Sequence, residues 1–479
     1  MKKFLSLLAC LMIAFSMTII PQADETVKAE LYAKVEDNGQ AIHKVVLDYG
    51  VEVSGVDVDT YTIHANTSSA DVPKADGEMA FGDFNADRKI VSVKVDGTKV
   101  EILLDENDGA AGTLSYYLLG ARNVPTTINY TVTQNKPVTT ATGTIENPTI
   151  VVDNTVRDEE VSKFVAVDDV IDYQFYEAPE GDSLIVWFHG NGEGDYVLGD
   201  YATHNNMAQV LANRGTVAWA TDEAQEIFGG AHVMSFQAPS HWYNSINNGL
   251  LEDAYNEIMD VVEKYGVDEE KIFVSGCSAG GFMSTRMIIA YPDLFAAAMI
   301  NCPALDIANA RAGEGITNAT PTDEELKSIL DSKTAIWLVQ GTTDASVKPE
   351  DCSIRMFNIL SEGAETIETR VDQEIQSGYT TTETKDGKYK LSLYDTTETG
   401  KLMFAEDFDQ DGTATYTEFS NHWSWIYTLR NNPTDASGTN IWTWAAAQPT
   451  AGGSSNTLLY VGIAAVIAIG AFVVMKKKK

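Results

Sequence analysis

The chain has 479 residues and a formal net charge of -36. This length is enough for two or three domains, each with its own core. The strong negative charge argues against binding to nucleic acids or to anionic membrane surfaces, and it favours a soluble, self-repelling surface.

The N-terminus is typical of a secretion signal. Two lysines precede an apolar run from Phe4 to Ile20, and a small-residue cleavage site could follow near Ala23 or Ala29. We therefore expect residues 1–29 to be a signal peptide that is removed on export.

The C-terminus carries an apolar segment of membrane-spanning length. The run from Leu458 to Met475 is just long enough to cross a bilayer as a helix, and the lysines at 476–479 follow it. Basic residues beside a span stay on the cytoplasmic side. We expect a transmembrane anchor at 457–475 and a cytoplasmic tail at 476–479. The layout resembles Gram-positive surface proteins, but no Leu-Pro-x-Thr-Gly signal precedes the span, so the anchor should be retained.

Three cysteines remain once the signal is removed: Cys277, Cys302 and Cys352. An odd number excludes a complete disulfide framework. Cys277 and Cys302 follow neighbouring predicted strands, so a bridge between them is conceivable. We favour the simpler interpretation that these are small buried hydrophobic side chains.

Residues 30–152 have no helical periodicity. Short runs alternate in the manner of strands, with Gly, Asn and Asp between them, and the clearest are 44–49, 59–64, 89–95, 99–104 and 127–132. Regularly spaced short strands with turn residues between them indicate a β-sandwich of Ig-like type. Such a domain could bind carbohydrate, position its neighbour or cover part of a site, and its residues do not select among these roles.

Residues 153–433 instead alternate strands with helices. Apolar runs predict strands at 183–188, 216–220, 271–274, 295–300 and 335–340, and periodic segments predict helices at 203–213 and 251–261. This alternation indicates βαβ units and a mostly parallel sheet with flanking helices. The continuous apolar strands fit a sheet that is covered on both faces.

Two later segments look peripheral to this sheet. Residues 363–418 are polar and Thr-rich, with a favoured hairpin turn at Asp386-Gly387, and we interpret them as an insertion. Residues 434–456 contain Pro449 and a Gly-Gly-Ser-Ser run, so we expect a linker to the membrane span.

A Gly-x-Ser-x-Gly motif lies between a predicted strand and a predicted helix. Gly276, Ser278 and Gly280 follow the apolar run that ends at Val274. This is the context of a nucleophile elbow, in which a very tight turn requires small flanking residues and leaves the serine hydroxyl above the sheet edge. The backbone N–H of Ala279, at the helix N-terminus, could then hydrogen-bond a developing oxyanion.

A glycine-rich loop follows an earlier strand. The motif His-Gly-Asn-Gly-Glu occupies 189–193, directly after the apolar run 183–188. In α/β hydrolases a His-Gly motif here supplies a second oxyanion N–H, which we assign to Asn191. Its glycines let the backbone approach a substrate oxygen. The spacing does not fit the Gly-x-Gly-x-x-Gly nucleotide-binding motif.

Asp344 and His422 are the candidate acid and base. Asp344 lies in a polar turn after an apolar run, and His422 alone of the seven histidines follows it in the chain. The order Ser, Asp, His is that of α/β hydrolases. A buried carboxylate orients the imidazole and stabilises its cation, and His422 would take the Ser278 proton and return it to the leaving group. Glu350 and Asp351 are the fallback acids.

These motifs resemble those of secreted bacterial α/β-hydrolase esterases. The four that carry the resemblance are the His-Gly loop at 189–193, Gly-Cys-Ser-Ala-Gly-Gly at 276–281, Gly-x-x-Asp at 341–344 and His-Trp-Ser-Trp at 422–425. The nearest group is polyhydroxybutyrate-depolymerase and feruloyl-esterase-like, and it includes members with an Ig-like N-terminal domain. The resemblance implies an α/β-hydrolase fold, a Ser278–Asp344–His422 triad and no cofactor for the chemistry.

An acidic loop beside the histidine matches the EF-hand calcium pattern. The candidate ligands are Asp407, Asp409, Asp411, Thr413, Thr415 and Glu418. Gly412 would make the sharp turn, although Ala414 replaces the usual branched aliphatic residue and no helix enters the loop. The alternative is an ordinary acidic surface loop. Because Glu418 lies four residues before His422, we expect a bound structural Ca²⁺ to fix the histidine loop.

Together these features predict a membrane-anchored serine esterase outside a bacterial cell, which hydrolyses carboxylic esters through an acyl-enzyme. The family and the surface location suggest an ester on polysaccharide, plant phenolic or polyester material. Two alternatives stay open. A prolyl-oligopeptidase-like serine peptidase uses the same triad in the same order, and a surface-binding protein could carry an inactive hydrolase domain.

Overall fold

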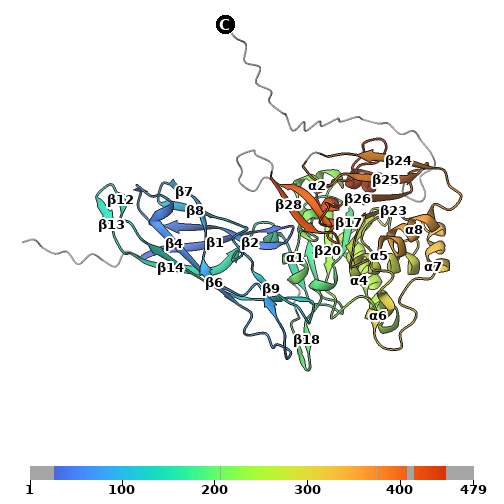
Figure 1. The fold of residues 1–479 in the computed structure, drawn as a ribbon, viewed down its shortest axis with the longest axis horizontal. Coiled ribbons are helices and arrows are strands. Elements are labelled where there is room, and N and C mark those ends of the chain that lie inside the picture. The colour runs from blue at the N-terminus through green and yellow to red at the C-terminus, as the bar shows by residue number, and fades with distance from the viewer. Residues whose placement is uncertain (1–25, 205–206, 374, 407–414, 449–479) are drawn as a thin grey trace, which may run out of the picture.

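A computed structural model describes residues 26–204, 207–373, 375–406 and 415–448. They form an N-terminal β domain and a C-terminal α/β domain that lie side by side (Figure 1). In these ranges no helix is both long and apolar enough to cross a membrane. The expected signal residues 1–25, the core of the acidic loop at 407–414, the span at 457–475 and the tail at 476–479 all lie outside the described residues.

The N-terminal domain has the predicted Ig-like all-β character. Its strands are β1 (Thr26–Glu36), β2 (Gly39–Asp48), β3 (Val53–Ser54), β4 (Tyr61–Ser68), β5 (Ala80–Phe81), β6 (Phe84–Asp87), β7 (Ile90–Asp96), β8 (Lys99–Leu104), β9 (Leu114–Tyr117), β10 (Arg122–Pro125), β11 (Thr127–Gln134), β12 (Val138–Thr140), β13 (Gly143–Ile145) and β14 (Thr149–Arg157). The largest sheet has the order β14-β1-β2-β8-β7, and β11-β4-β6 and β10-β9-β5 are separate sheets. Alternate residues along β1, β4 and β8 point into one apolar core.

Both predicted boundaries of this domain are wrong by a few residues. β1 begins at Thr26, inside the expected signal segment 1–29, because Ala29 is buried in the core of the sandwich. β14 runs parallel to β1 and continues to Arg157, so a boundary between 152 and 153 would cut a strand.

The α/β domain contains one sheet of ten strands. They are β15 (Val165–Val167), β16 (Tyr173–Tyr176), β17 (Ser183–Phe188), β20 (Ala231–Phe236), β21 (Ile272–Cys277), β22 (Ala297–Asn301), β23 (Ala335–Gly341), β24 (Thr366–Val371), β25 (Tyr379–Thr384) and β26 (Tyr389–Tyr394). The order is β15-β16-β20-β17-β21-β22-β23-β26-β25-β24, and the six strands from β20 to β26 in this order are parallel.

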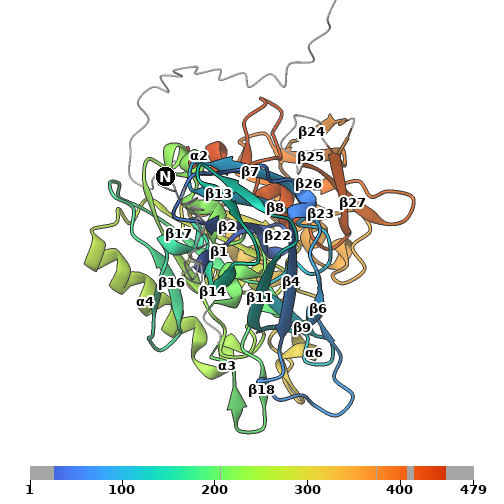
Figure 2. The ribbon, with the colours of Figure 1, turned by 90° about the vertical axis from the view of Figure 1, so that its left-hand side faces the viewer.

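Helices and two hairpins surround this sheet. The helices are α1 (Ala208–Leu211), α2 (Asp222–Ile227), α3 (Ser245–Asn248), α4 (Leu250–Tyr265), α5 (Ala279–Ala290), α6 (Ala308–Ala312), α7 (Asp323–Ser328), α8 (Ser353–Leu360), α9 (Trp425–Thr428) and α10 (Ile441–Ala446). The hairpins pair β18 (Val197–Leu198) with β19 (Tyr201–Ala202) and β27 (Lys401–Glu406) with β28 (Thr415–Ser420). Seen from the β-domain end, α4 and β24 lie on opposite sides of the molecule (Figure 2).

Three sequence interpretations of this domain are wrong. The run 216–220 is not a strand but a 3-10 helix, η4 (Val217–Ala220), and the strand beside β17 is β20. Residues 363–418 are not an insertion, because β24, β25 and β26 complete the central sheet. Residues 434–456 are not simply a linker, because α10 packs Trp444 edge-on against Trp337 at a ring distance of 5.3 Å.

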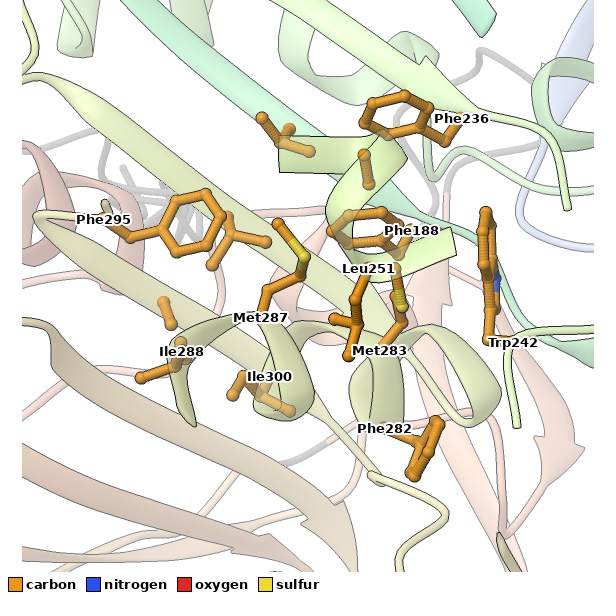
Figure 3. Packing of buried hydrophobic residues seen from close by; sticks show 14 of the residues in the cluster. Phe188, Phe236, Trp242, Leu251, Phe282, Met283, Met287, Ile288, Phe295 and Ile300 are labelled. Atoms are coloured by element: carbon orange, nitrogen blue, oxygen red, sulfur yellow. The ribbon is translucent and has the colours of Figure 1, made fainter. Parts of the chain in front are cut away.

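The sheet is covered on both faces, as its apolar strands predict. In β17 the side chains of Leu184 and Val186 join one core cluster, and those of Ile185 and Trp187 join the other. Helix α5 packs in the first cluster, where its Met283 and Met287 lie near the ring of Phe188 at the end of β17 (Figure 3). The helix that follows the Gly-x-Ser-x-Gly motif is therefore held rigidly against the sheet.

Candidate active site

Ser278 occupies a strained turn between β21 and α5. Its backbone has φ 53° and ψ -113°, a conformation that residues with a side chain rarely adopt. A Cβ atom on Gly276 would lie 2.6 Å from the carbonyl oxygen of Gly280, and one on Gly280 would overlap the carbonyl oxygen of Phe188. The structure thus gives a steric reason for both glycines of the motif and places Ser278 in an elbow.

The His-Gly loop lies directly beside this elbow. β17 and β21 are parallel neighbours with Phe188 opposite Gly276, so the segments that follow them emerge side by side. A short helical turn, η3 (Asn191–Glu193), begins in the loop, and α5 begins at Ala279. The first N–H groups of a helix have no acceptor in the preceding turn. Asn191 and Ala279 are therefore both N–H donors at the N-termini of helical segments near Ser278.

Asp344 and His422 form a hydrogen-bonded pair. The imidazole Nδ1 lies 2.7 Å from Oδ2 of the carboxylate. The other carboxylate oxygen accepts the backbone N–H groups of Ser346 and Val347, at 2.9 and 3.0 Å. The side-chain amide of Gln340 donates to Oδ2 at 3.1 Å. The Asp344 side chain is fully buried, and its donors fix its orientation toward the histidine.

The loop that carries His422 packs on the end of β23. Asn421 donates its side-chain amide to the carbonyl oxygen of Thr343 at 2.5 Å, and a Cβ on Gly341 would lie 2.5 Å from the Asn421 carbonyl oxygen. Ser424 donates its hydroxyl to the carbonyl of Val339. Direct contacts thus bring together Asp344 and His422, which the sequence separates widely.

Cys302 is a third neighbour of the histidine that the sequence analysis did not assign to the site. One polar atom from each of Cys302, Asp344 and His422 lies within 4.8 Å of the others. Burial disfavours a charged imidazole, but Cys302 and the hydrogen-bonded Asp344 together raise the pKa of His422 above its ordinary value. Cys302 has no functional motif around it, and the end of an apolar strand is the only signal of its place.

The cysteines match the simpler of the two interpretations. Cys277, Cys302 and Cys352 are buried and free, so no bridge joins Cys277 to Cys302. Burial raises the pKa of the Cys277 thiol well above its usual range. A thiol of this kind is unreactive.

His189 is a neutral structural side chain rather than a base. It is buried, and its Nε2 accepts the backbone N–H of Ala238 at 2.9 Å while Nδ1 lies 2.6 Å from the carbonyl oxygen of Gly190. One ring nitrogen accepts and the other donates, which defines a neutral tautomer. Burial lowers the pKa of His189 to about 3. The ring therefore braces the start of the loop.

Glu193 places a second carboxyl beside the pair. Burial raises the pKa of Glu193 to about 7, against the opposing effects of Arg122 and the backbone N–H groups of Glu193 and Gly190. Gly190 is the N-cap of η3, and Glu193 is the third residue of η3. The Glu193 carboxyl accepts the backbone N–H of Gly190, which is one half of a capping box. The carboxyl thus stabilises the turn that presents Asn191.

Ser278, Asn191, Glu193 and His422 line one cavity of about 750 Å³. The described part of the β domain contributes a wall to the same cavity, through Asp37, Asn38, Tyr116, Ala121 and Asn123. The sequence analysis left the role of this domain open, because contacts between distant segments have no local sequence signal. A cavity of this volume, with a few converging polar groups, is what a small-molecule site requires.

Of the candidate calcium ligands, only Thr415 and Glu418 lie among the described residues. Asp407, Asp409, Asp411 and Thr413 lie outside the described residues, and Thr415 begins β28. Glu418 is exposed on the same strand, which leads directly to the His422 turn.

Comparisons with known proteins agree with this architecture. Residues 28–147 match the family model for the esterase Ig-like N-terminal domain, and residues 203–395 match that of the prolyl oligopeptidase family. Acetylxylan esterase A from Aspergillus awamori is 29% identical over 120 residues, which are 24% of this chain and 36% of that protein. The matched part therefore spans about a third of the curated relative.

A solved structure is similar over most of the chain. The crystal structure of a thermostable esterase has a TM-score of 0.59 at 20% identity, with 84% of this chain and 96% of that chain covered. At this identity the likeness shows a shared fold. The chain has an α/β-hydrolase fold preceded by an Ig-like N-terminal domain, and its two domains match the family models for the esterase Ig-like domain and for prolyl oligopeptidases.

Proposed function

We propose that this protein is a serine hydrolase that cleaves carboxylic esters. One observation carries the proposal: His422, hydrogen-bonded to the buried Asp344 carboxylate, and the strained Ser278 elbow line the same cavity. His422 takes the proton of Ser278 as its oxygen attacks the ester carbonyl, and Asp344 stabilises the imidazolium. The N–H groups of Asn191 and Ala279 bind the oxyanion. The alcohol leaves with the proton, and water then hydrolyses the acyl-enzyme.

The substrate class that we propose is an ester carried on polysaccharide, plant phenolic or polyester material. The relative from Aspergillus awamori is named an acetylxylan esterase, which supports the first of these. The proposed place of action is the outer face of a bacterial membrane, with export directed by the apolar N-terminal segment that precedes β1 and anchoring by 457–475. The apolar runs of these two segments support this part of the proposal.

We also propose a structural role for calcium at 407–418. The ligand spacing supports it, and so does the short path along β28 from Glu418 to His422. Removing calcium should lower both the activity and the melting temperature, and Glu418→Gln should reduce the response to added calcium. If a chelator changes neither the activity nor the melting temperature, the structural role for calcium is wrong.

The second candidate is a serine peptidase of the prolyl oligopeptidase type. The match of residues 203–395 to that family favours it, and the triad chemistry is the same. Hydrolysis of p-nitrophenyl acetate and acetylated xylan should exceed that of proline-containing peptide amides. A preference for the peptide amides would replace the esterase proposal by the peptidase.

A labelling experiment tests whether the site is active at all. The protein should react with a fluorophosphonate probe and hydrolyse p-nitrophenyl acetate, and Ser278→Ala should abolish both. Ser162→Ala is a matched control, because Ser162 is exposed and lies outside the cavity. A folded native protein that neither labels nor hydrolyses esters would instead support a surface-binding protein with an inactive domain.

A further inference from the structure

The β domain touches the loop that carries the candidate oxyanion donor Asn191. In the β9–β10 pair, Tyr116 lies directly opposite Asn123, so both side chains emerge on the same face of the sheet. Asn123 donates its side-chain amide to the carbonyl oxygen of Gly192 at 3.1 Å. Gly192 is the central residue of η3 (Asn191–Glu193). A hydrogen bond from one domain therefore ends on the oxyanion turn of the other.

The β9–β10 face lies close against the turn at Gly192. A Cβ atom on Gly192 would lie 3.4 Å from Nδ2 of Asn123 and 3.8 Å from the ring of Tyr116. The phenol ring and the amide thus cover the outer side of the turn at van der Waals distance.

A neighbouring arginine extends the contact to the residues that follow the turn. The buried Arg122 donates from Nε to the carbonyl oxygen of Asp195 at 3.2 Å, and from Nη2 to that of Ser240 at 2.8 Å. Hydrogen bonds from a guanidinium to buried carbonyls are stronger than those between neutral groups. These hydrogen bonds fix β10 against the catalytic domain. Asn123, the residue after Arg122 in β10, is therefore held in a defined position.

The inner side of the same turn is held by the catalytic domain itself. Gln237 donates its side-chain amide to the carbonyl of Glu193 at 2.6 Å, and the Asp195 N–H donates to the carbonyl of Ala238 at 3.1 Å. The turn is thus fixed between its own sheet on one side and β10 on the other. An N–H donor contributes to an oxyanion site only if it is held in place before the reaction.

We propose that Asn123, supported by Tyr116, is a positioning residue of the oxyanion turn, through which the β domain takes part in catalysis. This rests on the proposed ester hydrolysis. The amide of Asn123 fixes the Gly192 carbonyl and with it the direction of the Asn191 N–H. Neither side chain moves a proton or bonds to the reacting carbonyl in this role.

The test compares Asn123→Ala with the isosteric Asn123→Asp. In Asn123→Ala the turn loses one hydrogen bond, and kcat should fall roughly 10- to 100-fold at nearly unchanged KM, because orientation is needed mainly in the transition state. Asn123→Asp places an acceptor against the Gly192 carbonyl, so its loss should be at least as large although its shape is closer to the native one. Asn107→Ala is a matched control, because Asn107 is an exposed residue of the same domain outside the cavity.

A transition-state analogue separates positioning from simple binding. Phenylboronic acid forms a tetrahedral adduct with a reactive serine and places an oxygen in the oxyanion site. Its inhibition constant should rise in parallel with the loss of kcat in both Asn123 variants, while the melting temperature stays close to that of the native protein. A kcat within twofold of native in both variants, or a loss confined to KM, would overturn the proposal.

Failure of the positioning role of Asn123 can be distinguished from failure of the proposed ester hydrolysis. A native protein that labels with fluorophosphonate and hydrolyses esters, with Asn123 variants that match it, overturns only the positioning role. A native protein that does neither removes the reaction on which the role rests.

Discussion

Replacing Asp344 by asparagine is the sharpest test of the acid–base pair. Oδ1 accepts two backbone N–H groups, from Ser346 and Val347, and Oδ2 accepts from Gln340 and His422. The backbone N–H groups of Ser346 and Val347 cannot reorient, so the side-chain oxygen of the asparagine should occupy the Oδ1 position, where it can accept both. Its NH₂ group then faces two donors that formerly pointed at an oxygen.

The expected cost follows from the histidine tautomer. To accept from the new amide, His422 must release its Nδ1 proton and carry it on Nε2, which removes the lone pair that would accept the Ser278 proton. We expect kcat to fall by about 1,000- to 10,000-fold, or roughly 4–5.5 kcal/mol in the activation barrier. Stability should fall by only about 1–3 kcal/mol, because one buried hydrogen bond is lost.

The assay is p-nitrophenyl acetate hydrolysis with the rate of fluorophosphonate labelling measured alongside. Asp351→Asn is the matched control, because Asp351 is an exposed carboxylate of the same loop and the fallback acid of the sequence analysis. It should keep kcat within twofold. If Asp344→Asn keeps more than a tenth of the native kcat, or if Asp351→Asn loses as much as Asp344→Asn, the assignment of the acid is wrong.

Three further predictions concern the elbow, a buried carboxyl and the thiols. Gly280→Ala should lower the melting temperature and abolish labelling of the serine, because its methyl group would overlap the Phe188 carbonyl; a fully active variant would show that the turn can open. Burial raises the pKa of Glu257 to about 8 from 4.5, and Glu257 accepts the Ile171 N–H. The folded state then holds a proton that the unfolded state has released, so stability should decrease as the pH rises from about 4.5 to 8. In Glu257→Gln this part of the pH dependence of denaturant unfolding should disappear, and an unchanged slope would contradict the assigned shift. In a protein that begins at residue 26, iodoacetamide should modify none of the three cysteines before unfolding and all of them in denaturant, because each is buried; labelling of the native protein would refute this.

Apolar runs predicted four strands of the central sheet, but β20 beside β17 was missed and the polar strands were not predicted. β17, β21, β22 and β23 read as continuous hydrophobic segments. β26 contains Lys390, which is buried only because Glu383 and Asp435 pair with it and Trp337 lies beneath its ammonium group. Asp435 and Trp337 are distant from Lys390 in the sequence, so local hydrophobicity alone placed this strand in a peripheral insertion.

The same distinction applies to the site. Ser278, Asp344 and His422 follow from short motifs and their chain order, because each follows a strand of one sheet or the hairpin beside it. Cys302 and Asn123 carry no such motif. Their places depend on packing between segments far apart in the chain, which a single sequence does not contain.

The turn between β1 and β2 forms part of the rim of the cavity that contains Ser278. Its Asp37 is buried and pairs with Arg430 of the catalytic domain, and with Asn38 it reaches the cavity that contains Ser278. The rim of the cavity is thus partly encoded by a module that folds around its own core. Mutations there can reshape what enters without disturbing the strands that hold the hydroxyl and the imidazole. Substitutions in this turn of the sandwich are therefore expected to alter which substrates enter, whereas substitutions in the buried strands of the sheet are expected to alter stability.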